Sequence, residues 1–119
     1  MKITFIETDE YEATLLVKTS VGEFISYADS VNIKSKDNFE KVEFFTLLSK
    51  NIVKDFDQRL SINKTNSGYF SYKISGKYIG ENRILLDDCI FIVDSKIPGD
   101  IKVNDYVSFE FLRADAYIA

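Results

Sequence analysis

The side chains that most often carry out enzyme chemistry are nearly absent from this chain of 119 residues, which has no histidine and one cysteine, Cys89. Without histidine, neither a Ser-His-Asp nor a Cys-His arrangement can form, and a zinc ion would find only Cys89 and carboxylates as ligands. Asp87 and Asp88 stand beside Cys89. Because neighbouring carboxylates raise the pKa of a thiol, we expect Cys89 to be a small buried hydrophobic residue. The composition predicts a protein that is not an enzyme.

Asp87 and Asp88 also interrupt an apolar segment, 83–93, whose pattern is typical of one strand. Adjacent residues of a strand point to opposite faces, so these two carboxylates cannot converge on one substrate atom. We expect them to accept backbone N–H groups at a bend in the strand, or to pair with Arg83 or Arg113. The functional alternative is an acidic surface that meets an arginine or lysine of a partner.

Neither a cofactor nor a metal ion is expected. The five glycines form no phosphate-binding motif of the Gly-x-Gly-x-x-Gly or Walker type. Asp87, Asp88, Glu110 and Asp115 carry the oxygen ligands that magnesium prefers, but no spacing rule joins them into a site.

Aromatic side chains give a better functional lead, since the chain has 10 phenylalanines and 7 tyrosines. Tyr69, Phe70 and Tyr72 fall on one predicted strand and Tyr78 follows them, interleaved with lysines. On a sheet of the OB type such side chains can stack on nucleobases or sugars. The alternative is that about half of them build the core, because aromatic residues dominate the cores of β-proteins.

The charge distribution favours a basic partner. The net charge is −4, and residues 1–30 carry six acidic side chains against two basic ones. No basic stripe is present, which disfavours nucleic acid as the partner, whereas an acidic face steers towards a basic protein. Tyrosine anchors interfaces at a low entropic cost. The predicted partner-binding residues are Asp87, Asp88, Glu110, Asp115, Tyr72, Tyr78 and Tyr106.

The remaining pattern predicts a single β-rich domain over residues 1–119. Strand-forming residue types are abundant, alanine is scarce, and alternating segments predict strands at 2–7, 13–19, 23–28, 69–79, 83–93 and 106–112. The polar segment 64–68 predicts a loop, and Gly76 predicts a β-bulge. The segment 37–56 is ambiguous. It can form a helix, but we favour a strand at about 41–48 followed by a short helical turn.

The segment Asn104-Asp105-Tyr106-Val107-Ser108-Phe109 resembles the Gly-Asp-x-Val-x-Phe element of small barrels of the OB and SH3-like kinds. The resemblance covers about nine residues and is shared by several families. Together with the strand pattern it implies a mainly β fold: a small antiparallel barrel or sandwich, OB-like or SH3-like, with six to eight strands and at most one short helix.

Three functions fit this sequence. A single cysteine cannot form an internal disulfide, and no apolar segment is long enough to span a membrane, so we expect a cytoplasmic protein without membrane contact. The leading hypothesis is an immunity or inhibitor protein that neutralises a basic toxin, such as a nuclease, through an acidic surface containing tyrosine. The alternatives are an OB-type module binding single-stranded nucleic acid or oligosaccharide, and an accessory subunit of a larger assembly. Exposed edge strands also leave room for a homo-oligomer.

Overall fold

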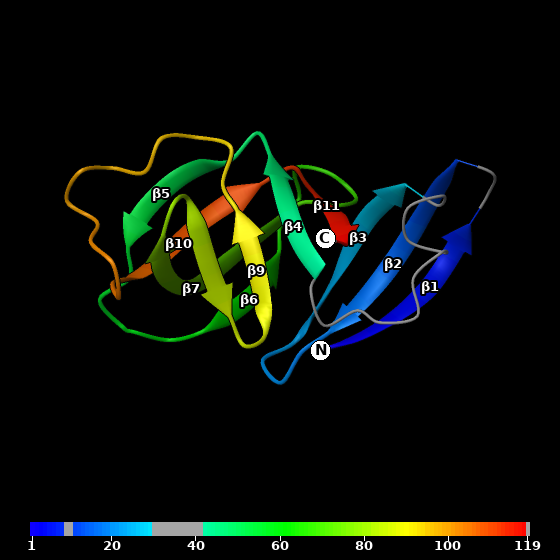
Figure 1. Cartoon of the computed structure of the whole chain (residues 1–119), viewed down its shortest axis with the longest axis horizontal. Coiled ribbons are helices and arrows are strands. Elements are labelled where there is room, and N and C mark those ends of the chain that lie inside the picture. Colours follow the sequence, from blue (N-terminus) through cyan, green and yellow to red (C-terminus); the bar gives the residue numbers. More distant parts are fainter. Residues whose placement is uncertain (9–10, 30–41, 119) are drawn as a thin grey trace.

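A computed structural model describes residues 1–8, 11–29 and 42–118, and these residues form eleven β-strands and no helix (Figure 1). The strands are β1 (Lys2–Thr8), β2 (Glu12–Lys18), β3 (Glu23–Asp29), β4 (Val42–Leu47), β5 (Lys50–Lys54), β6 (Ser61–Lys64), β7 (Tyr72–Gly80), β8 (Arg83–Leu86), β9 (Cys89–Ile92), β10 (Tyr106–Phe111) and β11 (Arg113–Ile118). The mainly β prediction is confirmed. The predicted count of six to eight strands is too low, because a turn divides the segment 83–93 into β8 and β9 and because β5, β6 and β11 lie outside the predicted ranges.

All the strands belong to one mixed sheet with the order β1-β2-β3-β11-β4-β9-β8-β7-β10-β5, and β6 pairs with β7 off this path. The sheet begins at β1 and ends at β5 without closing, so the predicted barrel is wrong. The prediction of purely antiparallel pairing is also wrong, since β11 runs parallel to β3 and β4 runs parallel to β9. These pairings join segments far apart in the sequence, and a local pattern carries no information on them.

Four strands form a bent two-stranded ribbon, in which β4 continues into β5 and β10 continues into β11. β4 and β5 are separated only by Leu48 and Ser49, and β10 and β11 only by Leu112. The antiparallel ladder runs from β4·β11 into β5·β10, and the N–H of Leu112 donates to the carbonyl of Leu47 at the bend (3.0 Å). We call residues 47–49 and 112 the ribbon corner. The predicted strand at 41–48 is confirmed, but the helical turn after it is wrong because β5 pairs with β10; residues 37–41 lie outside the described residues.

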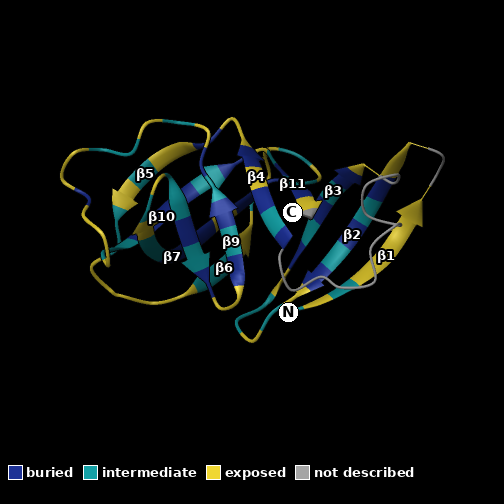
Figure 2. Ribbon diagram, viewed as in Figure 1, coloured by how far each residue is buried: buried dark blue, intermediate teal, exposed yellow. Residues whose placement is uncertain are grey.

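Three of the largest buried side chains pack together from β4, which belongs to the ribbon, and from β3 and β9. Phe24 of β3, Phe44 of β4 and Phe91 of β9 are fully buried, and their ring centroids lie 5.0 to 5.5 Å apart. Edge-to-face and tilted packing of this kind is favourable beyond the area that it buries. The inner strands are therefore largely buried, while the end strands β1 and β5 stay mostly exposed (Figure 2).

The segment predicted as one strand, 83–93, is a hairpin. Leu86 pairs with Cys89, so Asp87 and Asp88 are its two-residue turn. Asp87 has a φ of 56°, a left-handed conformation that aspartate tolerates better than most residues. The expectation that the two carboxylates point to opposite faces of a strand is therefore wrong.

The predicted β-bulge at Gly76 is also wrong. The irregularity of β7 lies between Tyr78 and Gly80, not at Gly76. A Cβ at position 76 would stand 2.7 Å from the carbonyl oxygen of Leu85 on the neighbouring strand. Gly76 is thus required by the close approach of β8 rather than by a bulge.

Candidate functional site

The two carboxylates of the β8–β9 turn bind within the protein. Asp87 accepts the backbone N–H of Ser20 (2.9 Å), and bonds from the Ser20 backbone and hydroxyl lower the pKa of its carboxyl. Asp88 pairs with the terminal ammonium group of Met1. The expectation of backbone N–H bonds is confirmed for Asp87. Pairing with Arg83 or Arg113 is wrong, because those guanidinium groups bind Glu43 and Asp115 instead.

Cys89 follows the same turn and is fully buried, as the sequence predicts. Burial, reinforced by the charge of Asp88, raises the pKa of its thiol to about 12. Its sulfur lies 3.5 Å from the sulfur of Met1. Among the described residues no cluster of three or more cysteine and carboxylate side chains could hold a metal ion, and none of the described segments is a helix long and apolar enough to cross a membrane.

The other predicted partner-binding residues lie on β7, β10 and β11, and they differ in burial and in their partners. Tyr72 is only 6% exposed and its hydroxyl accepts the N–H of Ile25 (3.1 Å), so its ring is part of the core. Tyr78 and Tyr106 are half-buried. Glu110 accepts a hydrogen bond from the amide of Asn51, and Asp115 pairs with Arg113. Thus the structure does not gather these seven residues into one surface.

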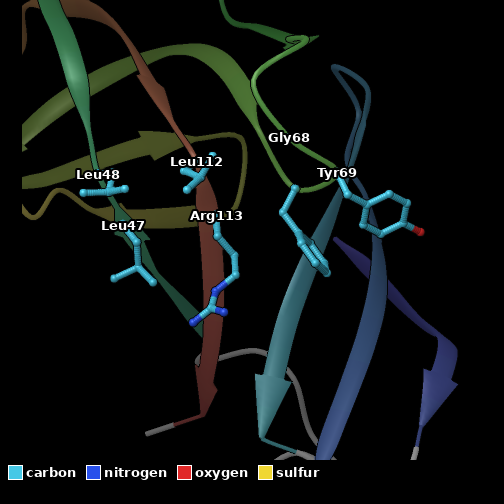
Figure 3. Close-up of a pocket in the computed structure, with 7 residues that line it drawn as sticks. Leu47, Leu48, Gly68, Tyr69, Leu112 and Arg113 are labelled. Carbon is cyan, nitrogen blue, oxygen red and sulfur yellow. The ribbon is translucent and has the colours of Figure 1, made fainter.

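The described part of the chain instead has a groove between the loop 65–71 and the ribbon corner (Figure 3). Its first part, the apolar pocket, has a volume of about 470 Å³ and is lined by Leu47, Leu48, Gly68, Tyr69, Phe70, Leu112 and Arg113. Leu47, Leu48 and Leu112 form one wall, and Tyr69 stands on the opposite side (Figure 3). Tyr69 and Phe70 belong to the loop, not to the predicted strand 69–79.

The second part of the groove, the acidic pocket, has a volume of about 360 Å³. It is lined by Glu7, Glu12, Thr14, Tyr27, Tyr69, Phe70 and Arg113. The two pockets share Tyr69, Phe70 and Arg113, so they are neighbours, and we refer to the two together as the groove.

A buried serine holds the loop wall of the groove. The hydroxyl of Ser71 bonds to the hydroxyl of Thr65 (2.7 Å) and accepts the N–H of Gly68 (2.8 Å). The ammonium of Lys64 donates to the carbonyl of Gly68. The loop so fixed presents Tyr69 and Phe70 as an edge-to-face pair with centroids 4.8 Å apart. The sequence predicts the loop at 64–68, but not its internal bonding.

Asp94 holds the opposite wall. Its carboxylate accepts the N–H groups of Leu48 (2.8 Å) and Ser49 (3.0 Å) at the ribbon corner. Burial alone would raise the pKa of Asp94, but the bonds from Ser49 and Leu48 outweigh it and lower the pKa. They also fix Leu48, whose φ is 54°, with its side chain 68% exposed. Sequence reasoning missed Asp94; the available signal was an acidic residue at the end of a strand, a common position for capping backbone N–H groups.

Arg113 stands where the two pockets meet. Its guanidinium binds Asp115 through two bonds of 2.6 and 2.9 Å and lies 4.3 Å from the centroid of the Tyr27 ring. The pKa of Tyr27 is raised by burial and next by the charge of Glu12, which lines the same pocket. The groove therefore combines an apolar half, a fixed cation and an acidic rim. Comparisons with protein-family models, with curated proteins and with solved structures found no match to this chain.

Proposed function

We propose that this chain is a non-catalytic binding protein that captures a basic protein partner in the groove. The specific form of the proposal is a cytoplasmic immunity or inhibitor protein that neutralises a basic toxin, such as a nuclease, by covering it. The observation that carries the proposal is the exposure of large apolar side chains around one depression, led by Leu48 (68%) and Tyr69 (61%). Soluble proteins rarely leave such patches uncovered unless they bind something.

The walls of the groove are fixed by hydrogen bonds in the free protein, which favours binding. Ser71 holds one wall and Asp94 holds the other, so Tyr69 and Leu48 are already positioned before a partner arrives. Association loses less entropy when the contact side chains are ordered in advance. Tyrosine is also among the side chains that most often anchor an interface.

Charge supports a basic partner. The chain carries −4 net charge, with six of its acidic residues in the first thirty positions. Two of them, Glu7 and Glu12, line the groove. Complementary charge accelerates association and suppresses wrong partners. The cytoplasmic part of the proposal rests on the single free cysteine, which offers no internal disulfide.

The test is titration calorimetry with the separately purified products of the genes that flank this one. We expect one basic product to bind, and Tyr69→Ser and Leu112→Ser each to weaken binding by about tenfold or more. Phe56→Ser is the matched control, since Phe56 is 88% exposed but follows β5 at the end remote from the corner. Binding unaffected by the two groove variants, or the absence of a basic binder, contradicts the proposal. Recovery only with a large assembly favours the accessory-subunit alternative.

A single-stranded nucleic acid is the second candidate, and the Tyr69–Phe70 pair, in which Tyr69 is exposed, favours it. Tyr72, which the stacking hypothesis also used, is buried, and the charge of Arg113 is matched by Asp115. A fluorescence titration with a single-stranded oligonucleotide at low salt decides between the two. Saturable, salt-sensitive binding that is lost in Tyr69→Ser would favour this second candidate.

A further inference from the structure

We propose that this chain forms a two-fold symmetric homodimer, in which β1 pairs antiparallel with β1 of a second copy. The inference goes beyond the proposed function, because it concerns the edge of the sheet and needs no foreign partner. β1 lies at one end of the sheet, and among the described strands it pairs with β2 alone (Figure 1). All of its residues except Ile3 are exposed (Figure 2).

The β-bulge of β1 places Lys2 and Glu7 on the same face of the sheet. Residues five apart in an unbroken strand point to opposite faces, but an extra residue stands between Phe5 and Glu7. Lys2 therefore lies opposite Lys18, and Glu7 lies opposite Thr14. Lys18 and Thr14 both belong to the outer set of β2, which alternates with its buried residues.

Because of this bulge, β1 is complementary to itself in one antiparallel register. With the two-fold axis at Thr4, this residue faces Thr4 of the second copy, Ile3 comes beside Phe5, and Lys2 comes opposite Glu7. Directly opposite residues of an antiparallel pair point to the same face, and each of these pairs meets that condition. Threonine pairs, pairs of an aromatic with a β-branched residue, and pairs of opposite charge are all favourable across strands.

The charges at the two ends of β1 favour a second copy as the occupant of this edge. Lys2 stands opposite Lys18, and like charges directly opposite each other are unfavourable. The acidic residue in the same row, Glu23, lies opposite Lys18 and not Lys2. Within the described segments neither Lys2 nor Glu7 forms an ion pair. The register at Thr4 supplies both partners at once.

The other end of the sheet, β5, is unsuited to the same pairing. β5 begins with Lys50 and ends with Lys54, so pairing antiparallel with itself would place lysine opposite lysine. Edge lysines of this kind commonly prevent association between sheets. β1 is therefore the edge that can pair with itself. One short strand pair buries little area, so we expect a weak dimer with a dissociation constant on the order of 100 µM.

Charge reversal tests this register, with sedimentation equilibrium at low salt and protein concentrations up to millimolar as the measurement. We expect the parent chain to dimerise. Lys2→Glu and Glu7→Lys each replace two attractive pairs by two repulsive ones, so each should weaken the dimer by about tenfold or more. An equimolar mixture of these two variants should form a heterodimer about as tight as the parent dimer, since every pair in it joins a glutamate to a lysine.

Matched controls exclude an effect of net charge alone. Glu81→Lys changes the net charge as much as Glu7→Lys does, at an exposed turn between β7 and β8, and should dimerise like the parent. Mixing Glu81→Lys with Lys2→Glu should produce no heterodimer of parent affinity. Tyr69→Ser should also dimerise like the parent, because the groove takes no part in this contact.

The outcomes judge the dimer separately from the proposed function, because no foreign partner is present. A parent chain that stays monomeric at millimolar concentration refutes the dimer. Dimerisation that survives both charge reversals, or a mixture of the two variants that stays monomeric, refutes pairing through β1. Loss of the dimer in Tyr69→Ser would place self-association in the groove and contradict the inference.

Discussion

The β8–β9 turn and the groove are both exposed to solvent, and they differ in whether the protein itself binds the side chains that they present. At the turn between β8 and β9, Asp87 and Asp88 bind the backbone of Ser20 and the terminal ammonium of Met1. At the groove, Tyr69 and Leu48 are 61% and 68% exposed. Ser71 and Asp94 accept hydrogen bonds from backbone N–H groups near Tyr69 and Leu48. These bonds do not involve the side chains of Tyr69 and Leu48, which remain exposed at the groove.

The difference teaches where a binding surface is to be sought. Two adjacent polar residues in a sequence often accept hydrogen bonds from backbone N–H groups, because strand ends and turns leave N–H groups that need acceptors. An apolar side chain held at the surface by a well-bonded backbone has no such internal explanation. For this reason the groove, and not the Asp87–Asp88 turn, carries the proposed function.

The largest expected effect concerns the chemical reactivity of Cys89, which follows the β8–β9 turn. A thiol pKa of about 12, against an ordinary value of 9.0, lowers the thiolate fraction of Cys89 near neutral pH about a thousandfold. We therefore expect alkylation of native Cys89 to be negligible at neutral pH and complete in denaturant, measured by mass spectrometry. Rapid alkylation of the native protein would mean that this region opens and that the contrast with the groove is wrong.

The next effect concerns the loop wall of the groove. Ser71→Ala leaves the N–H of Gly68 and the hydroxyl of Thr65 without a buried partner, so we expect a loss of about 2 kcal/mol in the free energy of unfolding. Partner binding should weaken as well, because Tyr69 is no longer fixed. Urea denaturation gives the stability. Ser67→Ala, an exposed change in the same loop, should stay within about 0.5 kcal/mol of the parent.

The ribbon corner gives a smaller effect. Asp94→Ala removes the acceptor for the N–H groups of Leu48 and Ser49, and we expect about 1 kcal/mol of destabilisation after discounting for solvent screening. Since the pKa of Asp94 is lowered in the folded state, its contribution is present above the ordinary carboxyl pKa and lost as the pH falls through the folded value. A variant that retains the full acid dependence of the parent would contradict this role.

The smallest effect belongs to the turn. Asp87→Asn should leave partner binding unchanged. The pKa of Asp87 is lowered by Ser20, so the stabilisation that it provides at neutral pH disappears as the pH falls through the folded value. The variant should therefore lose less stability than the parent between about pH 6 and pH 3. A large loss of binding in Asp87→Asn would reverse the comparison and move the site to the turn.

The sequence predicts the strands well where one face alternates. β1, β2, β3, β4 and β10 lie close to the predicted ranges, because alternation and turn residues are local signals. The β8–β9 turn was missed, since Asp-Asp lacks the glycine that usually marks a two-residue hairpin. The open sheet and its two parallel pairs depend on contacts between distant segments, which a single sequence does not encode locally.

The candidate site was predicted only in part. Tyr69 and Phe70 were recognised as a functional lead, but Leu47, Leu48 and Leu112 were not, because leucine in a β-rich sequence usually belongs to the core. Their exposure follows from the bend of both ribbon strands at one place. The acidity that favours a basic partner was visible in the sequence. The residues that line the groove, Glu7 and Glu12, were not distinguished from the other acids.

Hydrogen exchange of the free protein and of its complex with the basic partner tests the central claim most directly. We predict that protection on binding appears at 47–49, 66–70 and 112–113 and leaves 86–89 unchanged. Protection centred on 86–89, with the loop and the ribbon corner exchanging as in the free protein, would contradict the assignment of the groove as the binding surface.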